Sequence, residues 1–103
     1  MRLQISKLAL GDLAAIYDHT LAEWGEAQAI KYVNSLWDAM EEIQRAPERR
    51  RLRNDIYPGS RARGCGRHLI IYRSRKGEIQ VSRVLHRAMD LKRHVPPSFM
   101  GEE

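Results

Sequence analysis

The residues best suited to chemistry lie in the segment VSRVLHRAMD, at positions 81–90. This segment should begin as a strand and end in a helical turn, so that Arg83, His86 and Asp90 gather at one strand end. With Arg67 nearby, the set could cleave RNA, because guanidinium groups stabilise the phosphorane charge and an imidazole can activate the 2′-hydroxyl. If the chain is a ribonuclease, its predicted catalytic residues are Arg67, Arg83 and His86. The alternative for His86 and Asp90 is an arrangement at the start of a helix, in which Asp90 also forms an ion pair with Arg87 or Arg93.

Positive charge is concentrated in the second part of the chain. Residues 1–44 contain three lysines and arginines against seven acids, whereas residues 45–103 contain 15 against six, so the net charges are −4 and +9. The guanidinium of arginine offers several donors in one plane, which suits carboxylates and phosphates. The basic part therefore favours an acidic partner, which could be a protein tail, a protein surface or a nucleic acid. The alternative is that these arginines only solubilise the surface.

The histidines and the single cysteine form no metal-binding or nucleophilic motif. No two of the four histidines stand four residues apart, and Cys65 has no ligand partner close in sequence. Neither a metal nor a cofactor is therefore expected. His68 should project from its strand on the face opposite Cys65, so Cys65 is expected to be structural. A lone cysteine cannot form an internal disulfide, so we expect the protein to be located in the reducing cytoplasm.

The apolar spacing predicts an α+β domain in which a helical hairpin packs on one face of a small antiparallel sheet. A strand over residues 2–6 leads into helices over 8–24 and 26–45, with Ser6 as N-cap and Gly25 ending the first helix. Strands follow over 60–64, 67–73 and 79–86, then a helix over 87–94, in the order β-αα-βββ-α. We expect one domain over 1–97, a mobile tail over 98–103, no signal peptide and no membrane span.

One core should lie between the helices and the sheet. Apolar residues that recur at helical or strand spacing are expected to be buried there: Leu13, Tyr17, Leu21, Val33, Leu36, Met40, Ile43, Ile71 and Val81. Trp24 closes the apolar stripe of the first helix and is also expected to pack in the core. Tyr57 is expected to anchor a turn.

An ordered set of motifs resembles the ParE branch of the ParE/RelE toxin superfamily. The set comprises DLxxI at 12–16, WGxxQAxxY at 24–32, Pro47, GxR at 59–61, GxHxIxYR at 66–73 and IxVxRVLHxxMD at 79–90. The resemblance implies the RelE/ParE-like fold and the toxin of a type II toxin–antitoxin pair. Such a toxin would inhibit DNA gyrase by protein–protein binding and be neutralised by a ParD-type antitoxin in a hetero-oligomer.

The resemblance also indicates which residues meet the partners. The C-terminal segment of the antitoxin would wrap the helices and the sheet, and the region from His86 onward is commonly implicated in toxicity. Together with the basic cluster, this gives a set expected to bind the antitoxin or the target: Arg61, Arg63, Arg67, Arg83, His86, Met89 and Asp90.

The alternative function is a RelE-type endoribonuclease, an mRNA interferase. The RelE nucleases tend to carry a lysine-rich segment and a C-terminal tyrosine. Here the last tyrosine is Tyr72, and the only lysines after Gly59 are Lys76 and Lys92. The nuclease set is therefore incomplete, which favours a protein inhibitor that is not an enzyme. A basic nucleic-acid-binding module is a third option, but few aromatic side chains are available to stack on bases, and no sequence-specific binding is expected.

Overall fold

The computed structural model of the 103-residue chain describes residues 1–95, apart from the side chain of Lys92. β1 (Arg2–Ile5) precedes the helices α1 (Lys7–Trp24) and α2 (Glu26–Arg45), which are followed by a short 3-10 helix, η1 (Pro47–Arg49). β2 (Ser60–Cys65), β3 (His68–Arg75) and β4 (Glu78–His86) then lead to α3 (Leu91–His94). The predicted order of elements is confirmed. The predicted tail over 98–103 and the predicted domain end at residue 97 lie outside the described residues.

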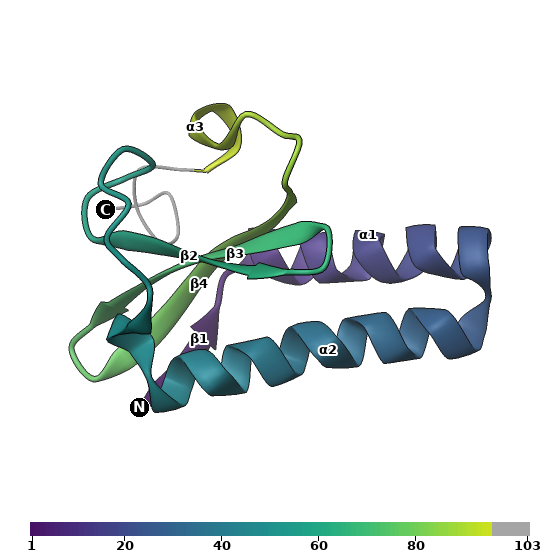
Figure 1. The fold of residues 1–103 in the computed structure, drawn as a ribbon, viewed down its shortest axis with the longest axis horizontal. Helices are drawn as coiled ribbons and strands as arrows, with labels where there is room; N and C mark the ends of the chain where they lie inside the picture. Colours follow the sequence, from purple (N-terminus) through teal and green to yellow (C-terminus); the bar gives the residue numbers. More distant parts are fainter. Residues whose placement is uncertain (96–103) are drawn as a thin grey trace.

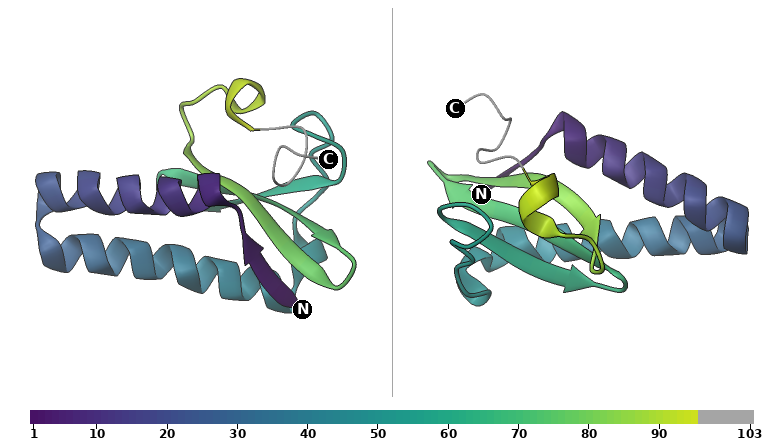
Figure 2. Two further views of the ribbon diagram at one scale, coloured as in Figure 1. Left: turned by 180° about the vertical axis from the view of Figure 1, so that it is seen from behind. Right: turned by 90° about the horizontal axis from the view of Figure 1, so that it is seen from above.

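The helices α1 and α2 form the predicted hairpin on one face of the sheet, and α3 lies on the other face (Figure 1; Figure 2). The hydroxyl of Ser6 caps α1 by accepting from the Ala9 N–H at 3.0 Å. Gly25 adopts a φ of 88°, which lets the chain reverse between the helices. The hairpin is longer than the strands, so its closed end projects beyond the sheet (Figure 1). Within residues 1–95, no helix is long and apolar enough to cross a membrane.

The sheet is mixed and not wholly antiparallel as predicted. Its order is β1-β4-β3-β2, in which β1 runs parallel to β4 and the other neighbours are antiparallel. The direction of β1 is fixed where it leads into α1, because Ser6 donates from its N–H to the Val81 carbonyl at 3.0 Å. Its hydroxyl also donates to the Ser82 carbonyl at 2.7 Å. The α+β class is confirmed, but a four-residue strand alternates identically in either direction, so the sequence could not assign its orientation.

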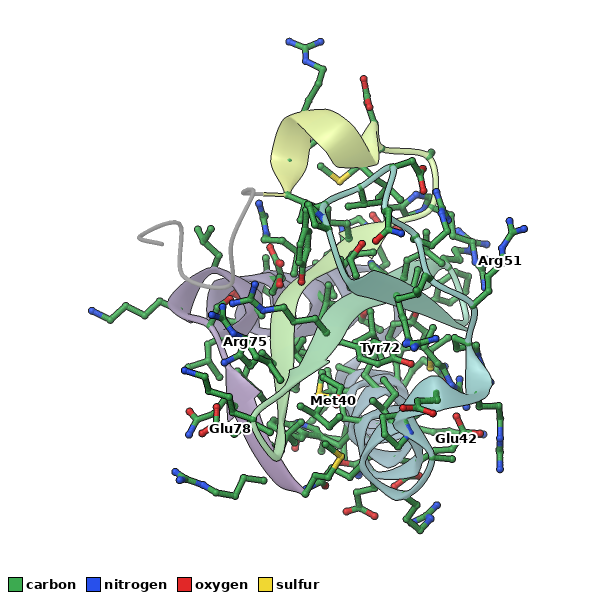
Figure 3. All side chains as sticks on the ribbon, turned by 90° about the vertical axis from the view of Figure 1, so that its left-hand side faces the viewer. Met40, Glu42, Arg51, Tyr72, Arg75 and Glu78 are labelled. Carbon is green, nitrogen blue, oxygen red and sulfur yellow. The ribbon has the colours of Figure 1, made fainter. Side chains whose placement is uncertain are left out.

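Two cores flank the sheet where the sequence predicted one. The first lies between the hairpin and the sheet and includes Leu36. Met40 and Tyr72, labelled in Figure 3, belong to the same core. The second lies on the opposite face, formed by the loop before β2, the sheet and the residue that follows α3: Ile56, Tyr57, Ile71, Leu85 and Val95. Because both faces are covered, β3 is buried at four successive positions from Ile70 to Arg73. The hydroxyl of Tyr57 contacts that of Ser82 at 2.6 Å, so Tyr57 anchors its loop as predicted.

The buried face of α1 differs from the predicted one. Leu21 is 39% exposed and Trp24 is 71% exposed, so the prediction that both pack in the core was wrong. The buried positions of α1 are Ala9, Leu13, Ile16 and Thr20. Leu10, Tyr17 and Leu21 each follow one of these positions and therefore lie about 100° further round the helix. Trp24 is exposed because it stands at the end of the hairpin that projects beyond the sheet (Figure 1).

The other predicted core residues divide in the same way. Six are buried: Leu13, Leu36, Met40, Ile43, Ile71 and Val81. Tyr17 and Val33 are only partly buried. The apolar arc of each helix is thus wider than the face that the sheet covers, and apolar spacing alone does not identify the covered part.

The last helix begins four residues later than predicted. The Arg87 N–H donates to the Arg67 carbonyl at 2.9 Å, which continues the pairing beyond β4. The Met89 N–H then donates to the His86 carbonyl at 3.0 Å, so residues 88–90 form a turn before α3. Asp90 occupies the N-cap position of α3, where its side chain makes no capping hydrogen bond.

Candidate functional site

Arg83 is held by a carboxylate of the first helix. Its Nε and Nη2 atoms donate to Asp12 at 2.8 and 2.7 Å, and the Val84 N–H donates to the same carboxylate at 2.9 Å. The Nη1 atom of Arg83 donates to the His94 carbonyl at 2.5 Å. The hydrogen bond with Asp12 raises the pKa of Arg83, against the opposing effect of burial. Arg83 therefore connects β4 with α1 and α3, and its guanidinium already makes three hydrogen bonds within the chain.

The arginines of β2 are also engaged within the chain. The Nε atom of Arg63 donates to Glu42 of α2 at 3.0 Å, and its Nη1 donates to the Gly64 carbonyl at 2.6 Å. The hydrogen bond from Arg63 lowers the pKa of the Glu42 carboxyl, and Arg50 nearby adds to the effect. Arg61 donates to the backbone carbonyl of Arg50. Both residues fasten the edge strand to its neighbours, so an acidic partner would have to compete for them.

Met89 and Asp90 are exposed in the turn before α3. Asp90 stands at the start of α3, as the alternative for this carboxylate predicted. The ion pair predicted with it is wrong, because no ion pair joins Asp90 to Arg87 or Arg93 among the residues that the structure describes. The Nε atom of Arg87 instead donates to the Gly66 carbonyl at 3.0 Å. Arg87 thus lies across the turn between β2 and β3. Met89 and Asp90, which were predicted to bind the antitoxin or the target, remain exposed.

A hydrogen-bonded group joins α2 to the turn between β2 and β3. The hydroxyl of Tyr32 accepts from the Arg67 backbone N–H at 3.1 Å and lies 2.6 Å from Nδ1 of His68. The same hydroxyl donates to the Cys65 carbonyl at 3.4 Å, so it joins α2 to both ends of the turn. Burial, and then the nearby His86, lowers the pKa of His68, whereas burial raises the pKa of Tyr32.

His86 completes this group from the end of β4. Its ring meets that of His68 edge to face, with the ring centroids 5.5 Å apart. The Nδ1 atom of His86 accepts from the Ala88 N–H at 3.1 Å, so its Nε2 atom bears a proton. The two imidazoles therefore lie next to each other, and each has its Nδ1 engaged in a hydrogen bond within the chain.

These side chains line a cleft of about 670 Å³, bounded by the projecting end of the hairpin, the turn between β2 and β3, and the end of β4. The lining of this histidine-lined cleft consists of nine residues: His19, Thr20, Trp24, Gln28, Tyr32, Gly66, Arg67, His68 and His86. It contains Arg67 and His86 of the predicted ribonuclease set but not Arg83. Within residues 1–95, no three His, Cys, Asp or Glu side chains converge as ligands for a metal.

Sequence reasoning assigned no site role to most of this lining, although one feature could have indicated it. A two-residue turn, Gly66 and Arg67, makes Cys65 and His68 direct cross-strand partners, so their side chains share one face of the sheet. The prediction that His68 points away from Cys65 was therefore wrong. The thiol of Cys65 is directed elsewhere, to the Ser35 carbonyl at 3.6 Å.

A helical hairpin packed on a four-stranded mixed sheet places this chain in a known structural class. The chain resembles a chain of a solved structure described as the chromosomal ParDE TA system from P. aeruginosa. The TM-score is 0.73 and the sequence identity 27%, over 84% of this chain and 95% of that one. The fold is therefore that of the small α+β toxins of the ParE/RelE class.

Sequence comparisons identify the family. The model for the ParE toxin of type II toxin–antitoxin systems, parDE, matches residues 3–91, and the chain belongs to this family. It is 36% identical over 95 residues to Toxin ParE1 of Mycobacterium tuberculosis, covering 91% of this chain and 97% of that protein. It is 28% identical over 92 residues to Toxin ParE1 of Caulobacter vibrioides, covering 89% and 95%. The resemblance inferred from the motifs is thus confirmed.

Proposed function

We propose that this toxin inhibits DNA gyrase by protein–protein binding and that a ParD-type antitoxin neutralises it in a cytoplasmic hetero-oligomer. Its membership of the ParE family supports the proposal. The observation that carries it is a set of large apolar side chains on α1 and α2 that the described chain leaves partly exposed. These hairpin apolar residues are each between 37% and 71% exposed: Leu10, Leu21, Trp24, Ile30 and Trp37. Exposed apolar groups of this size mark surfaces that bind other proteins.

The chemistry of the surface specifies the antitoxin segment that would cover it. An amphipathic segment with apolar side chains at helical spacing would bury the hairpin apolar residues. Acidic side chains on the same segment would meet Arg67, which is exposed beside the hairpin. Arg61, Arg63 and Arg83 contribute less to this binding, because each is already hydrogen-bonded within the chain.

The proposal assigns no chemical step to the toxin. Of the residues that a ribonuclease would use, Arg83 is bound by Asp12 and does not reach the histidine-lined cleft. A RelE-type ribonuclease is the second candidate function. It is supported by the presence of Arg67, His68 and His86 together in that cleft, where an arginine and two imidazoles could act on a phosphodiester.

One preparation of the toxin separates the two functions. Purified toxin is tested for inhibition of gyrase supercoiling and for cleavage of ribosome-bound messenger RNA, each with and without the antitoxin. We expect supercoiling to be blocked, transcripts to stay intact, and the antitoxin to restore supercoiling. Cleaved transcripts with normal supercoiling would favour the ribonuclease and make His86 the leading candidate for a general base.

A pair of variants tests the surface itself. Trp37→Ser should weaken binding of the antitoxin at least tenfold, because Trp37 is one of the hairpin apolar residues. Asn34→Ser is the matched control, since Asn34 is an exposed polar residue on the same helix. It should leave the affinity unchanged. Equal affinities for both variants would exclude Trp37 from the interface.

A further inference from the structure

We propose that the histidine-lined cleft binds a nucleotide, which is a nucleoside monophosphate either free or as one unit of a single strand. Neither gyrase inhibition nor neutralisation by an antitoxin requires this cleft to hold a small ligand. The proposal rests on three properties of the cleft: its hydrogen-bond donors, its exposed aromatic ring and the rigidity of its polar end.

The lining is rich in donors and contains no acid. Arg67 supplies a guanidinium whose planar fork suits a phosphate. His68 and His86 each have Nδ1 engaged in a hydrogen bond, which leaves Nε2 for a ligand, and Nε2 of His86 carries a proton because its Nδ1 accepts from Ala88. Gln28 and Trp24 add an amide and an indole N–H. None of the nine lining residues is Asp or Glu, so an anion with several acceptor atoms complements this surface.

The cleft also offers an aromatic surface. Trp24 is 71% exposed at the projecting end of the hairpin and lines the cleft opposite the strand ends. An indole stacks on a nucleobase without regard to base identity, because every base has a π-face. The volume of about 670 Å³ lies in the range of small-ligand sites. A nucleotide would use both the indole and the donors, whereas inorganic phosphate or a nucleoside would use only one of the two.

The polar end of the cleft is organised without any ligand. The hydroxyl of Tyr32 fixes both the His68 ring and the Arg67 backbone, at 2.6 and 3.1 Å. It can approach so closely because Gly66 has no side chain: a Cβ atom there would lie 2.7 Å from the hydroxyl oxygen. Arg87 closes the other side of the turn through the Gly66 carbonyl. The His68 ring and the backbone of the turn are thus held in place before binding and lose little freedom when an anion arrives.

Fluorescence of Trp24 provides the test. The full chain has two tryptophans, so Trp37→Phe leaves Trp24 as the single reporter. Titration with AMP should give saturable quenching, with a Kd at least tenfold lower than for adenosine or for inorganic phosphate. In that background, Arg67→Gln and His86→Gln should each raise the Kd for AMP at least fivefold. Melting curves verify that each variant is folded.

A matched control separates specific binding from general attraction. Arg51→Gln removes the same charge from an exposed arginine that points to solvent (Figure 3) and does not line the cleft. It should leave the Kd for AMP unchanged. A pentamer of adenylate identifies the source, because tighter binding than AMP indicates a single strand and equal or weaker binding indicates the free nucleotide.

Three outcomes would overturn the proposal. One is quenching that rises with AMP without saturating. Another is an equal loss of affinity for Arg51→Gln and Arg67→Gln, which would reflect the net charge of the chain. The third is a hexaglutamate peptide that binds as tightly as AMP and displaces it, which would assign the cleft to an acidic protein segment. Trp24 and Arg67 also belong to the surface proposed for the antitoxin, but none of these measurements involves gyrase or the antitoxin, so the two proposals can fail separately.

Discussion

At the scale of the residue, the ion pair of Asp12 and Arg83 is the best-connected polar contact between the helices and the sheet. The two side chains are 13% and 17% exposed and meet at 2.7 Å. Arg83→Gln would leave the Asp12 carboxylate partly buried without its cation. We expect a loss of about 1–3 kcal/mol in the free energy of unfolding, measured by urea denaturation.

A second ion pair provides the comparison. Arg53 and Asp55 meet at 2.9 Å, but their side chains are 31% and 48% exposed. Arg53→Gln should therefore cost less than about 1 kcal/mol, because water screens this pair. Equal losses for Arg53→Gln and Arg83→Gln would contradict a structural role for Arg83.

His68 gives the stability of the fold a pH dependence. Burial lowers its pKa from the ordinary value of 6.5, so the unfolded chain binds more protons as the pH falls through that value. The contribution of neutral His68 is present above 6.5 and is lost as the pH falls toward the folded-state pKa. We expect the urea midpoint to decrease between about pH 7.5 and pH 5.5, and to decrease less in His68→Gln. An equal decrease of the urea midpoint in the wild type and in His68→Gln would show that other titrating groups cause the pH dependence.

The sequence indicated which polar residues matter, but it did not reveal which residues they contact. Arg83 and His86 stand out within one short segment, but Asp12 lies 71 residues before Arg83, and no local spacing reveals that pair. His68 was assigned to the wrong face because the alternation was counted along the chain from Cys65, although Gly66 and Arg67 form a turn between two paired strands. A pairing across a two-residue turn reverses that assignment.

At the scale of the element, both long helices were predicted almost to the residue. Their signals are local: Ser6 begins α1, Gly25 separates the helices and Pro47 follows α2. Which part of each apolar arc is buried depends on where the sheet ends, and the sheet ends before Trp24 (Figure 1). The direction of β1 likewise depends on β4, which is its partner across most of the chain.

Two glycines test the turn that positions His68. Gly66 and Gly59 have φ values of +57° and +82°, where a Cβ atom costs about 1–2 kcal/mol. At Gly66 the added Cβ would also lie 2.7 Å from the Tyr32 hydroxyl, whereas at Gly59 nothing lies within 4 Å. We expect Gly66→Ala to lower the urea midpoint more than Gly59→Ala does. Equal shifts would show that the contact with Tyr32 relaxes without cost.

The C-terminal helix can be separated from the first core. Deletion after Arg87 removes Leu91 and Val95 from the second core and removes the carbonyl that Arg83 contacts. All residues of the first core precede Arg87. We expect a folded chain with a lower urea midpoint and reduced inhibition of gyrase, followed by circular dichroism and the supercoiling assay.

A longer truncation product is the control for this deletion. A chain that ends after Val95 retains α3 and the second core, and it should have a higher urea midpoint than the chain that ends at Arg87. If the chain ending at Arg87 inhibits gyrase fully, α3 and the turn before it are not part of the inhibitory surface. An unfolded product would show that the two cores are not independent.

At the scale of the whole molecule, the family could be predicted because its motifs are spread in order along the chain from residue 12 to residue 90. Each motif marks a structural position: a helix face, the hairpin turn or a strand. The uncovered apolar surface could not be predicted, because it depends on which helix residues the sheet leaves exposed. The fold also reduces the positive charge that is available to a partner, because it pairs Arg63 and Arg83 of the basic part with acids of the first 44 residues.

The remaining unpaired charge should make antitoxin binding sensitive to salt. The chain has a net charge of +5, and Arg67 is exposed beside the hairpin apolar residues, where acids of an antitoxin would meet it. Screening weakens such rim contacts but leaves apolar contacts largely intact. By calorimetry we expect the Kd to rise about fivefold or more between 50 and 300 mM salt, and Arg67→Gln to reduce this dependence. A Kd independent of salt would leave the hairpin apolar residues as the sole anchor of the antitoxin.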